Sequence, residues 1–202
     1  MNDSEIIKLF GQDSLRKLES TLQKSYSHGL LFIQENPMLQ EESAESFKQN
    51  IINFAIDYNL AKACREGLLD FGFRYAKNHA KNCKHIELLH NELILTHSSI
   101  NNGERVPRES IFRRYLSSTN QISFYGDETL NPPSYGILTH QHRENGNKKA
   151  IIYLGIPDSE YGYWCNEINL TLLNSGLMVS VSEEEYEDFK FELRKEQKEN
   201  QA

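Results

Sequence analysis

The feature that most constrains the fold is a change in the spacing of apolar residues along the chain. In the first part, apolar residues recur every three or four positions, as on the buried face of a helix. The clearest run comprises Leu15, Leu18, Leu22, Tyr26, Leu30 and Ile33. From His85 onward the chain is richer in β-branched and apolar runs that are typical of strands. The sequence therefore predicts an α+β protein, with an N-terminal helical layer (a helical hairpin or three helices), a small, mainly antiparallel sheet and a C-terminal helix.

The predicted elements divide the chain into three regions of one globular unit. Residues 1–85 are predicted to be helical, with a break at Asn36-Pro37, because proline disfavours helical geometry in the residue before it. Residues 86–181 are predicted to be rich in strands, with a short helix near 107–117. Residues 182–202 are predicted to form a C-terminal helix with a frayed tail, and Ser182 and Glu185 have the spacing of a capping box.

The composition narrows the environment in which the chain is expected to work. The 202 residues, 38% hydrophobic and 25% charged, are enough for one hydrophobic core. The N-terminus is polar and acidic, unlike a secretory signal, and no apolar run is long enough to cross a membrane. The three cysteines, Cys64, Cys83 and Cys165, are odd in number and widely spaced, which argues against a disulfide framework. A cytoplasmic location without membrane contact is expected.

The charge is distributed unevenly. The net charge is −7, which disfavours binding to nucleic acid over the whole surface. Residues 61–114 nevertheless carry ten Lys/Arg against six Asp/Glu, a balance of +4 that leaves −11 for the rest of the chain. This segment is interpreted as a solvated helix face, with a local surface for phosphate, nucleic acid or an acidic partner as the alternative.

A hairpin is predicted around Asn145-Gly146, because the two central residues of a type I′ turn need positive φ. With this dipeptide as the turn, His140 is expected opposite Ile151 and His142 opposite Lys149. The face that carries Ile137, Thr139, Ala150, Ile152 and Leu154 is the more apolar and is expected to meet the core. His140 and His142 are then expected to point together towards the more polar side.

The tetrapeptide Ile-Leu-Thr-His occurs twice, ending at His97 and at His140. If the two strands pair, then His97, His140 and His142 come together, an arrangement that suits general acid–base catalysis or a metal. The alternative is that the repeat reflects only what strands require, since isoleucine, leucine and threonine all fit a pleated surface.

Short motifs resemble three enzyme families. His97-Ser98-Ser99-Ile100 resembles the histidine-x-serine/threonine-apolar signature of two-histidine phosphoesterases, and the second copy reads His140-Gln141-His142-Arg143, with histidine in place of the hydroxyl residue. That resemblance implies histidines acting on a phosphodiester. The segment from His140 to Lys148 resembles the Fic-domain loop, with its glycine-rich part displaced and strands rather than helices around it.

The third resemblance lies upstream, where Arg74 and His79 have the arginine-x4-histidine spacing of HEPN-type ribonucleases. It implies that Arg74 binds a phosphate and His79 moves a proton. In the same stretch, four residues are of types that bind zinc: His79, Cys83, His85 and His90. Without a second cysteine pair beside them, they are interpreted as scattered polar residues, and neither a metal nor a cofactor is assigned.

A different kind of function is predicted from the rest of the chain. No Walker loop, dinucleotide-binding glycine pattern or nucleophile elbow is present in the sequence. The stretch with Tyr161, Tyr163 and Trp164 is rich in aromatic residues, which are common at protein interfaces. We therefore expect a non-enzymatic interaction or regulatory module of bacterial or phage type that binds another protein, with a possible homodimer through the N-terminal helices. The alternative is a metal-independent phosphodiesterase or ribonuclease with clustered histidines.

Overall fold

The structure is a computed structural model of the whole chain, and it describes residues 3–78, 83–100, 106–120, 134–142, 149–173 and 182–199. The architecture is α+β, as the sequence predicts. Helices α1 (Asp3–Phe10), α2 (Gln12–Glu35) and α3 (Glu45–Arg65) come first, with two short 3-10 helices, η1 (Pro37–Gln40) and η2 (Glu42–Ala44), between α2 and α3. The predicted stripe on α2 is confirmed, because Leu15, Leu18, Leu22, Tyr26 and Ile33 are all buried.

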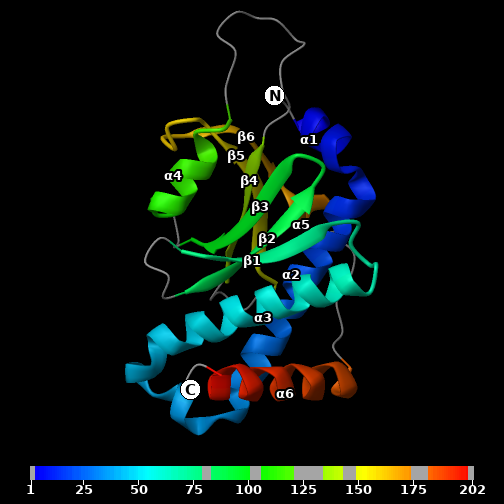
Figure 1. Cartoon of the computed structure of the whole chain (residues 1–202). Helices are drawn as coiled ribbons and strands as arrows, with labels where there is room; N and C mark the ends of the chain where they lie inside the picture. Colours follow the sequence, from blue (N-terminus) through cyan, green and yellow to red (C-terminus); the bar gives the residue numbers. More distant parts are fainter. Residues whose placement is uncertain are drawn as a thin grey trace, which may run out of the picture.

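A six-stranded sheet follows, with its strands in sequence order. The strands are β1 (Gly72–Lys77), β2 (Lys84–His90), β3 (Leu93–Ser99), β4 (Tyr135–Gln141), β5 (Ile151–Pro157) and β6 (Trp164–Asn169). All neighbouring strands are antiparallel except β3 and β4, which run parallel. The sheet is therefore mainly antiparallel, as predicted, with one parallel pair at its centre (Figure 1).

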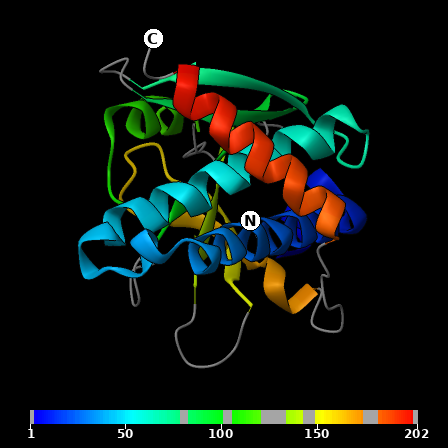
Figure 2. The ribbon, with the colours of Figure 1, turned by 90° about the horizontal axis from the view of Figure 1, so that it is seen from below.

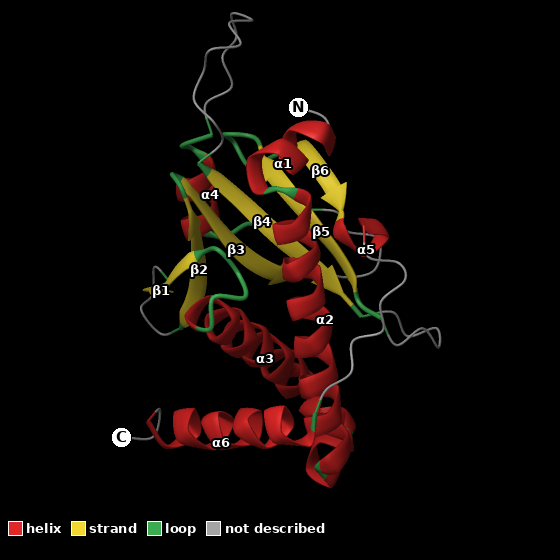
Figure 3. Cartoon of the chain, turned by 90° about the vertical axis from the view of Figure 1, so that its right-hand side faces the viewer, coloured by secondary structure: helices red, strands yellow, loops and turns green. Residues whose placement is uncertain are grey.

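Helices cover both faces of the sheet. Helices α2 and α3 pack on one face, and α4 (Ile111–Ser117) lies on the other (Figure 3). The short helix α5 (Leu170–Leu173) follows β6. The C-terminal helix α6 (Glu183–Glu199) crosses the outer side of α3 and α2 (Figure 2). Its predicted capping box is confirmed, because the Glu185 amide donates to the Ser182 hydroxyl and the Ser182 amide donates to the Glu185 carboxylate.

The prediction that the helical region extends to residue 85 was wrong. Helix α3 ends at Arg65, and Gly67 then adopts a positive φ of 70°, which stops the helix. Residues 72–77 form the edge strand β1, in which Phe73 and Tyr75 alternate with polar or small residues. Beyond the end of α3, apolar residues still recur every three or four positions, even where the alternation of a strand has begun. The spacing therefore predicted a helix in a segment that forms β1.

The predicted register of the β4–β5 pair was also wrong, by one residue. His140 lies opposite Ile152 rather than Ile151, and such a shift turns a side chain to the other face. His140 is completely buried among the residues that meet α2, instead of pointing to a polar side. The turn residues Asn145 and Gly146 lie outside the described residues.

Two further local features are a hairpin turn between β2 and β3 and the orientation of α4. The run from His85 to Ile100 contains a hairpin turn at Asn91, which has a φ of 54°, and this turn separates β2 from β3. In α4, Ile111 and Tyr115 face outward and are 65% and 73% exposed. The inward side of α4 carries Phe112 and Leu116, together with Arg113, whose guanidinium donates to the Ser98 hydroxyl and the Arg108 carbonyl.

Candidate functional site

Four side chains form a continuous line of hydrogen bonds between the sheet and the helices α2 and α3. His97 Nε2 lies 2.7 Å from Asp57 Oδ1, and His97 Nδ1 lies 3.1 Å from His140 Nε2. His140 Nδ1 in turn lies 2.7 Å from the Tyr26 hydroxyl. We call Asp57, His97, His140 and Tyr26 the relay. It joins α3 to β3, β4 and α2, and the histidines of the two Ile-Leu-Thr-His copies are its central members.

The parallel pairing of β3 and β4 explains why the two histidines meet. His97 lies opposite Leu138, and Ser99 lies opposite His140, so the histidines are diagonal neighbours on one face of the sheet. Side chains two residues apart on a strand share a face. The repeated tetrapeptide is offset by two positions in this pairing, and that offset brings the two imidazole rings to a centroid separation of 5.3 Å.

The direction of each hydrogen bond follows from its partners. The Asp57 carboxylate only accepts, so the His97 proton lies on Nε2 and His97 Nδ1 is left as an acceptor, and the Tyr26 hydroxyl accordingly donates to His140 Nδ1. His140 then carries its proton on Nε2 and donates to His97 Nδ1. His97 donates from Nε2 to the Asp57 carboxylate. All three protons therefore point towards Asp57.

Burial supports this protonation pattern. His140 has no exposed surface, and desolvation together with the neighbouring His97 holds its pKa well below the usual value. Burial also raises the pKa of the Tyr26 hydroxyl above its usual range. Each of these two residues thus keeps its uncharged form. Asp57 is the most exposed member of the relay, with 19% of its side-chain surface accessible against 7% for His97.

The Asp57 side chain lines a cleft with a volume of about 430 Å³. The cleft lies between α3, α6 and the outer strands β1 and β2, and its lining is charged and aromatic: Phe54, Asp57, Tyr58, Arg65, Tyr75, Lys77, Lys84, Glu192 and Lys195. Its volume lies in the usual range for a small-molecule site, about 300–1,000 Å³. No protein partner is recorded within the described residues for Asp57 Oδ2, so this oxygen can accept a proton from a bound molecule.

The third predicted histidine lies beyond the far end of the relay. His142 follows β4 and stacks on the Tyr26 ring, with a centroid separation of 6.1 Å and an angle of 19° between the rings. The structure therefore brings His97 and His140 together directly and His142 only through Tyr26. Sequence reasoning missed Tyr26 and Asp57 as site residues. The one signal for Asp57 was a lone acidic residue in an otherwise apolar stretch of α3.

The other predicted site residues lie apart from the relay. Arg74 belongs to β1, where its Nε lies 2.7 Å from Glu87 Oε2. The helical setting that the ribonuclease-like spacing implied is therefore absent at Arg74, and His79 lies outside the described residues. Arg143 and Glu144 in the Fic-like stretch also lie outside the described residues.

Two of the zinc-ligand candidates, His85 and His90, pack against aromatic rings, and His79 lies outside the described residues. His85 stacks on Phe112, with ring centroids 4.4 Å apart, while His90 packs against Phe10 and Phe71. Cys83 is exposed and not disulfide-bonded. In the parts of the chain that the structure describes, no group of three or more potential metal ligands is found.

The aromatic stretch after β5 is only partly at the surface. Tyr161 is 6% exposed and its hydroxyl donates to the Pro107 carbonyl. Trp164 is half-buried and its ring covers Gly155. Tyr163 is 60% exposed, so it is the member of this stretch that a partner could reach without rearrangement. A binding role for these residues stays a prediction.

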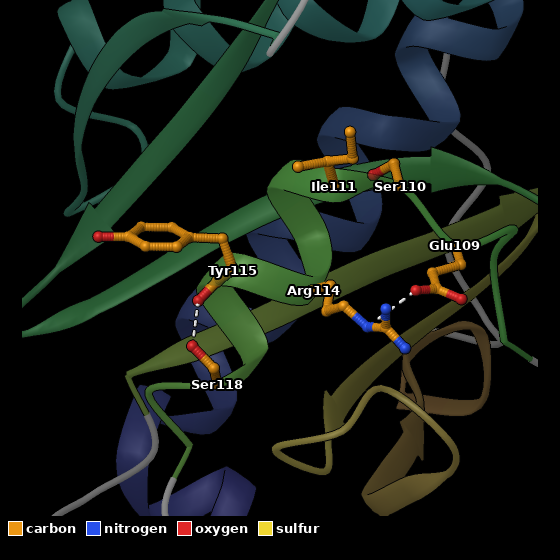
Figure 4. Close-up of a pocket in the computed structure, with 6 residues that line it drawn as sticks. All are labelled: Glu109, Ser110, Ile111, Arg114, Tyr115 and Ser118. Atoms are coloured by element: carbon orange, nitrogen blue, oxygen red, sulfur yellow. Dashed lines mark hydrogen bonds and ion pairs between the residues drawn. The ribbon is translucent and has the colours of Figure 1, made fainter.

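A second hollow lies beside α4, with a volume of about 590 Å³ (Figure 4). Its charged lining residues, Arg114 and Glu109, already form an ion pair of 2.9 Å. Tyr115 and Ile111 are largely exposed there. This hollow offers no buried acid or base, so the cleft at Asp57 is the better candidate for chemistry.

Comparisons with protein-family models, with curated proteins and with solved structures found no match to this chain. Among the helices within the described residues, none combines the length and apolar character that a membrane span requires.

Proposed function

We propose that this chain is an enzyme that performs general acid–base catalysis in the cleft, with Asp57 as the group that exchanges a proton with the substrate. The observation that carries the proposal is the relay itself, a directed line of hydrogen bonds that ends on a partly exposed carboxylate. A fully satisfied polar network in a low-dielectric interior holds its members in one geometry, which is what a positioned acid–base group requires.

Each member of the relay has a distinct role in this proposal. Asp57 removes a proton from water or a substrate hydroxyl through Oδ2 and returns a proton to the leaving group. His97 is a positioning residue, because its Nε2–H fixes the carboxylate through Oδ1. His140 and Tyr26 keep His97 in the tautomer that donates to Asp57. The reaction class supported by these residues is hydrolysis or transesterification that needs no metal.

The protein-binding module expected from the sequence is retained as a second candidate, because one other surface favours it. A hollow of about 580 Å³ between α2, η1, α3 and α6 is lined mainly by apolar side chains, including Phe32, Leu39, Ile51 and Leu193. At its rim Met38 is 84% exposed and Phe47 is 61% exposed. Exposed apolar groups of this kind mark interaction sites.

The enzyme proposal is tested with a panel of chromogenic esters, comprising a phosphodiester, a phosphomonoester and a carboxylic ester, together with cyclic nucleotides and RNA. We expect turnover of at least one substrate by the wild type. Asp57→Asn should lower kcat about 10²–10⁴-fold, since a positioned acid–base group contributes that much. His97→Gln should lower kcat by a smaller factor and change the pH profile.

The matched control is Asp70→Asn, which removes the same charge from an exposed position beyond α3. It should leave turnover unchanged. Turnover that survives Asp57→Asn, or is lost equally in Asp70→Asn, would rule out Asp57 as the acid–base group. For the second candidate, Met38→Ser with Phe47→Ser should abolish a partner complex while turnover persists. A complex that persists in this double variant would contradict that candidate.

A further inference from the structure

We propose that the ligand of the cleft is a nucleotide unit, with its phosphate bound by the basic residues Lys77, Lys84, Arg65 and Lys195 and its planar base held against the aromatic side chains. Turnover of this ligand rests on the proposed function, but its binding does not. A free nucleotide and a nucleotide within a strand both carry a phosphate and a planar base, so both are candidate ligands.

The first observation is a pair of like charges. Lys77 and Lys84 lie directly opposite one another in the β1–β2 register, as the last residue of β1 and the first residue of β2. Two ammonium groups in this relation repel each other and weaken the sheet. A bound phosphate between them would convert that repulsion into two charge-assisted hydrogen bonds.

The second observation is the charge balance of the cleft. Arg65 and Lys195 add two positive charges, and Asp57 and Glu192 supply the two negative ones. Within the described part of the chain, no ion pair is recorded for Arg65, Lys77, Lys84 or Lys195. The cleft thus has an excess of two positive charges in a chain whose net charge is −7. A local positive site with low-dielectric walls attracts anions to the cleft even when the net charge of the protein is negative.

The third observation is the aromatic part of the lining. Phe54 and Tyr58 on α3 and Tyr75 on β1 belong to the same cleft as the cations. Tyr75 is 49% exposed although its ring also contacts Phe73, with centroids 6.1 Å apart. Exposed rings beside cations suit a ligand with a planar face, since stacking of a base on an aromatic ring contributes about 1–3 kcal/mol.

The probe is adenosine 5′-monophosphate, titrated calorimetrically into the full chain. Adenosine, ribose 5-phosphate and a short oligoadenylate serve as comparison ligands. We expect the nucleotide to bind more tightly than either of its parts, and its affinity to fall as salt is added. Lys77→Ala combined with Lys84→Ala should weaken binding about tenfold or more, because two charge-assisted contacts are lost. Tyr75→Ala should weaken the binding of the nucleotide but not of ribose 5-phosphate.

Two controls separate the site from general charge effects and from catalysis. Lys17→Ala with Lys48→Ala removes the same charge from surface lysines that pair with Asp13 and Glu45, and it should leave affinity unchanged. Asp57→Asn should retain or tighten nucleotide binding while it removes turnover. Binding without turnover by the wild type would therefore reject the proposed function and support the nucleotide site.

The remaining outcomes are also decisive. Tighter binding of the mononucleotide identifies a free nucleotide as the source, and tighter binding of the oligoadenylate identifies a nucleotide within a strand. Both results support the site. An absence of binding of either ligand at millimolar concentration, or an affinity that is indifferent to the Lys77/Lys84 variant, would overturn the inference even if turnover of another ester were found.

Discussion

At the scale of single residues, the site depends on groups that stay uncharged because they are buried. His140 has one imidazole nitrogen that donates and one that accepts, and each has a partner. A charged His140 would donate from both nitrogens, so it could no longer accept from the Tyr26 hydroxyl. The hydrogen bonds therefore require the neutral imidazole, which burial also favours.

A conservative change at Tyr26 tests the hydrogen bond between its hydroxyl and His140. Tyr26→Phe removes the hydroxyl and leaves His140 Nδ1 buried without a donor. We expect the free energy of unfolding to fall by about 1–3 kcal/mol, the cost of an unsatisfied buried polar group. Urea denaturation measures the change. The matched control is Tyr153→Phe in β5, whose hydroxyl has no recorded hydrogen bond among the described residues, and it should be close to neutral. Equal effects of the two variants would contradict the predicted role of the Tyr26 hydroxyl.

Half of the relay could be predicted from the sequence at this scale. His97 and His140 were candidates because of their shared tetrapeptide and their expected strand ends. Tyr26 was assigned to the core stripe of α2, and burial confirms that assignment without revealing its hydrogen bond. Asp57 was not singled out, because its partner His97 is 40 residues away and only the tertiary packing joins them.

At the scale of elements, the ends of helices could be predicted from strong local sequence signals where tertiary packing did not override those signals. Pro37 ends α2 at Glu35, and the Ser182–Glu185 capping box starts α6, both as predicted. The register of β4 and β5 could not be predicted in the same way. Both faces of β4 are buried, so the alternation of apolar and polar residues that identifies an inward face is missing.

The β5–β6 pair provides a second test at this scale. Gly155 lies beneath the ring of Trp164, and a Cβ added at Gly155 would lie 2.6 Å from two ring carbons. Gly155→Ala should therefore displace the indole and destabilise the fold by about 1–3 kcal/mol. Because Trp164 is the single tryptophan of the chain, selectively excited tryptophan fluorescence reports on the surroundings of this indole, and its emission should shift to longer wavelength.

Gly162→Ala is the comparison, since a Cβ at Gly162 would meet only the Asp158 carboxylate at 3.9 Å. Its emission should match the wild type. An unshifted spectrum for Gly155→Ala would show that the indole does not rest on this glycine.

At the scale of the whole molecule, α6 joins the rest of the protein through a small aromatic cluster around Phe189. His28 of α2 stacks on Phe189 with a centroid separation of 5.3 Å, and the Asn59 amide donates to its Nδ1. Ion pairs of Lys24 with Glu185 and of Lys62 with Asp188 flank this contact. Burial, with a further contribution from Lys24, lowers the pKa of His28 to about 4.

This shift predicts how stability depends on pH. The folded chain resists protonation of His28 until about pH 4, whereas the unfolded chain takes up that proton near pH 6.5. The free energy of unfolding should thus be constant with respect to this group above pH 6.5 and decrease as the pH falls from 6.5 to about 4. The decrease from His28 alone is at most about 3 kcal/mol, and His140 acts in the same direction.

Denaturant unfolding at a series of pH values measures this decrease. In His28→Phe, which retains an aromatic ring against Phe189, the curve should be flatter over the same range, whatever the absolute stability of the variant. A slope equal to that of the wild type would assign the acid sensitivity to other groups.

The wide sequence separation within the relay has a consequence for the kinetics of folding. Tyr26 and His140 are 114 residues apart, and His97 is 43 residues from His140. The parallel strands β3 and β4 can pair only after the crossover between them has closed, and contacts over such separations form slowly. We expect the relay to be among the last contacts made. A partly folded intermediate would then have helices and hairpins without the relay, so, under the proposed function, the return of activity during refolding would lag behind the return of secondary structure.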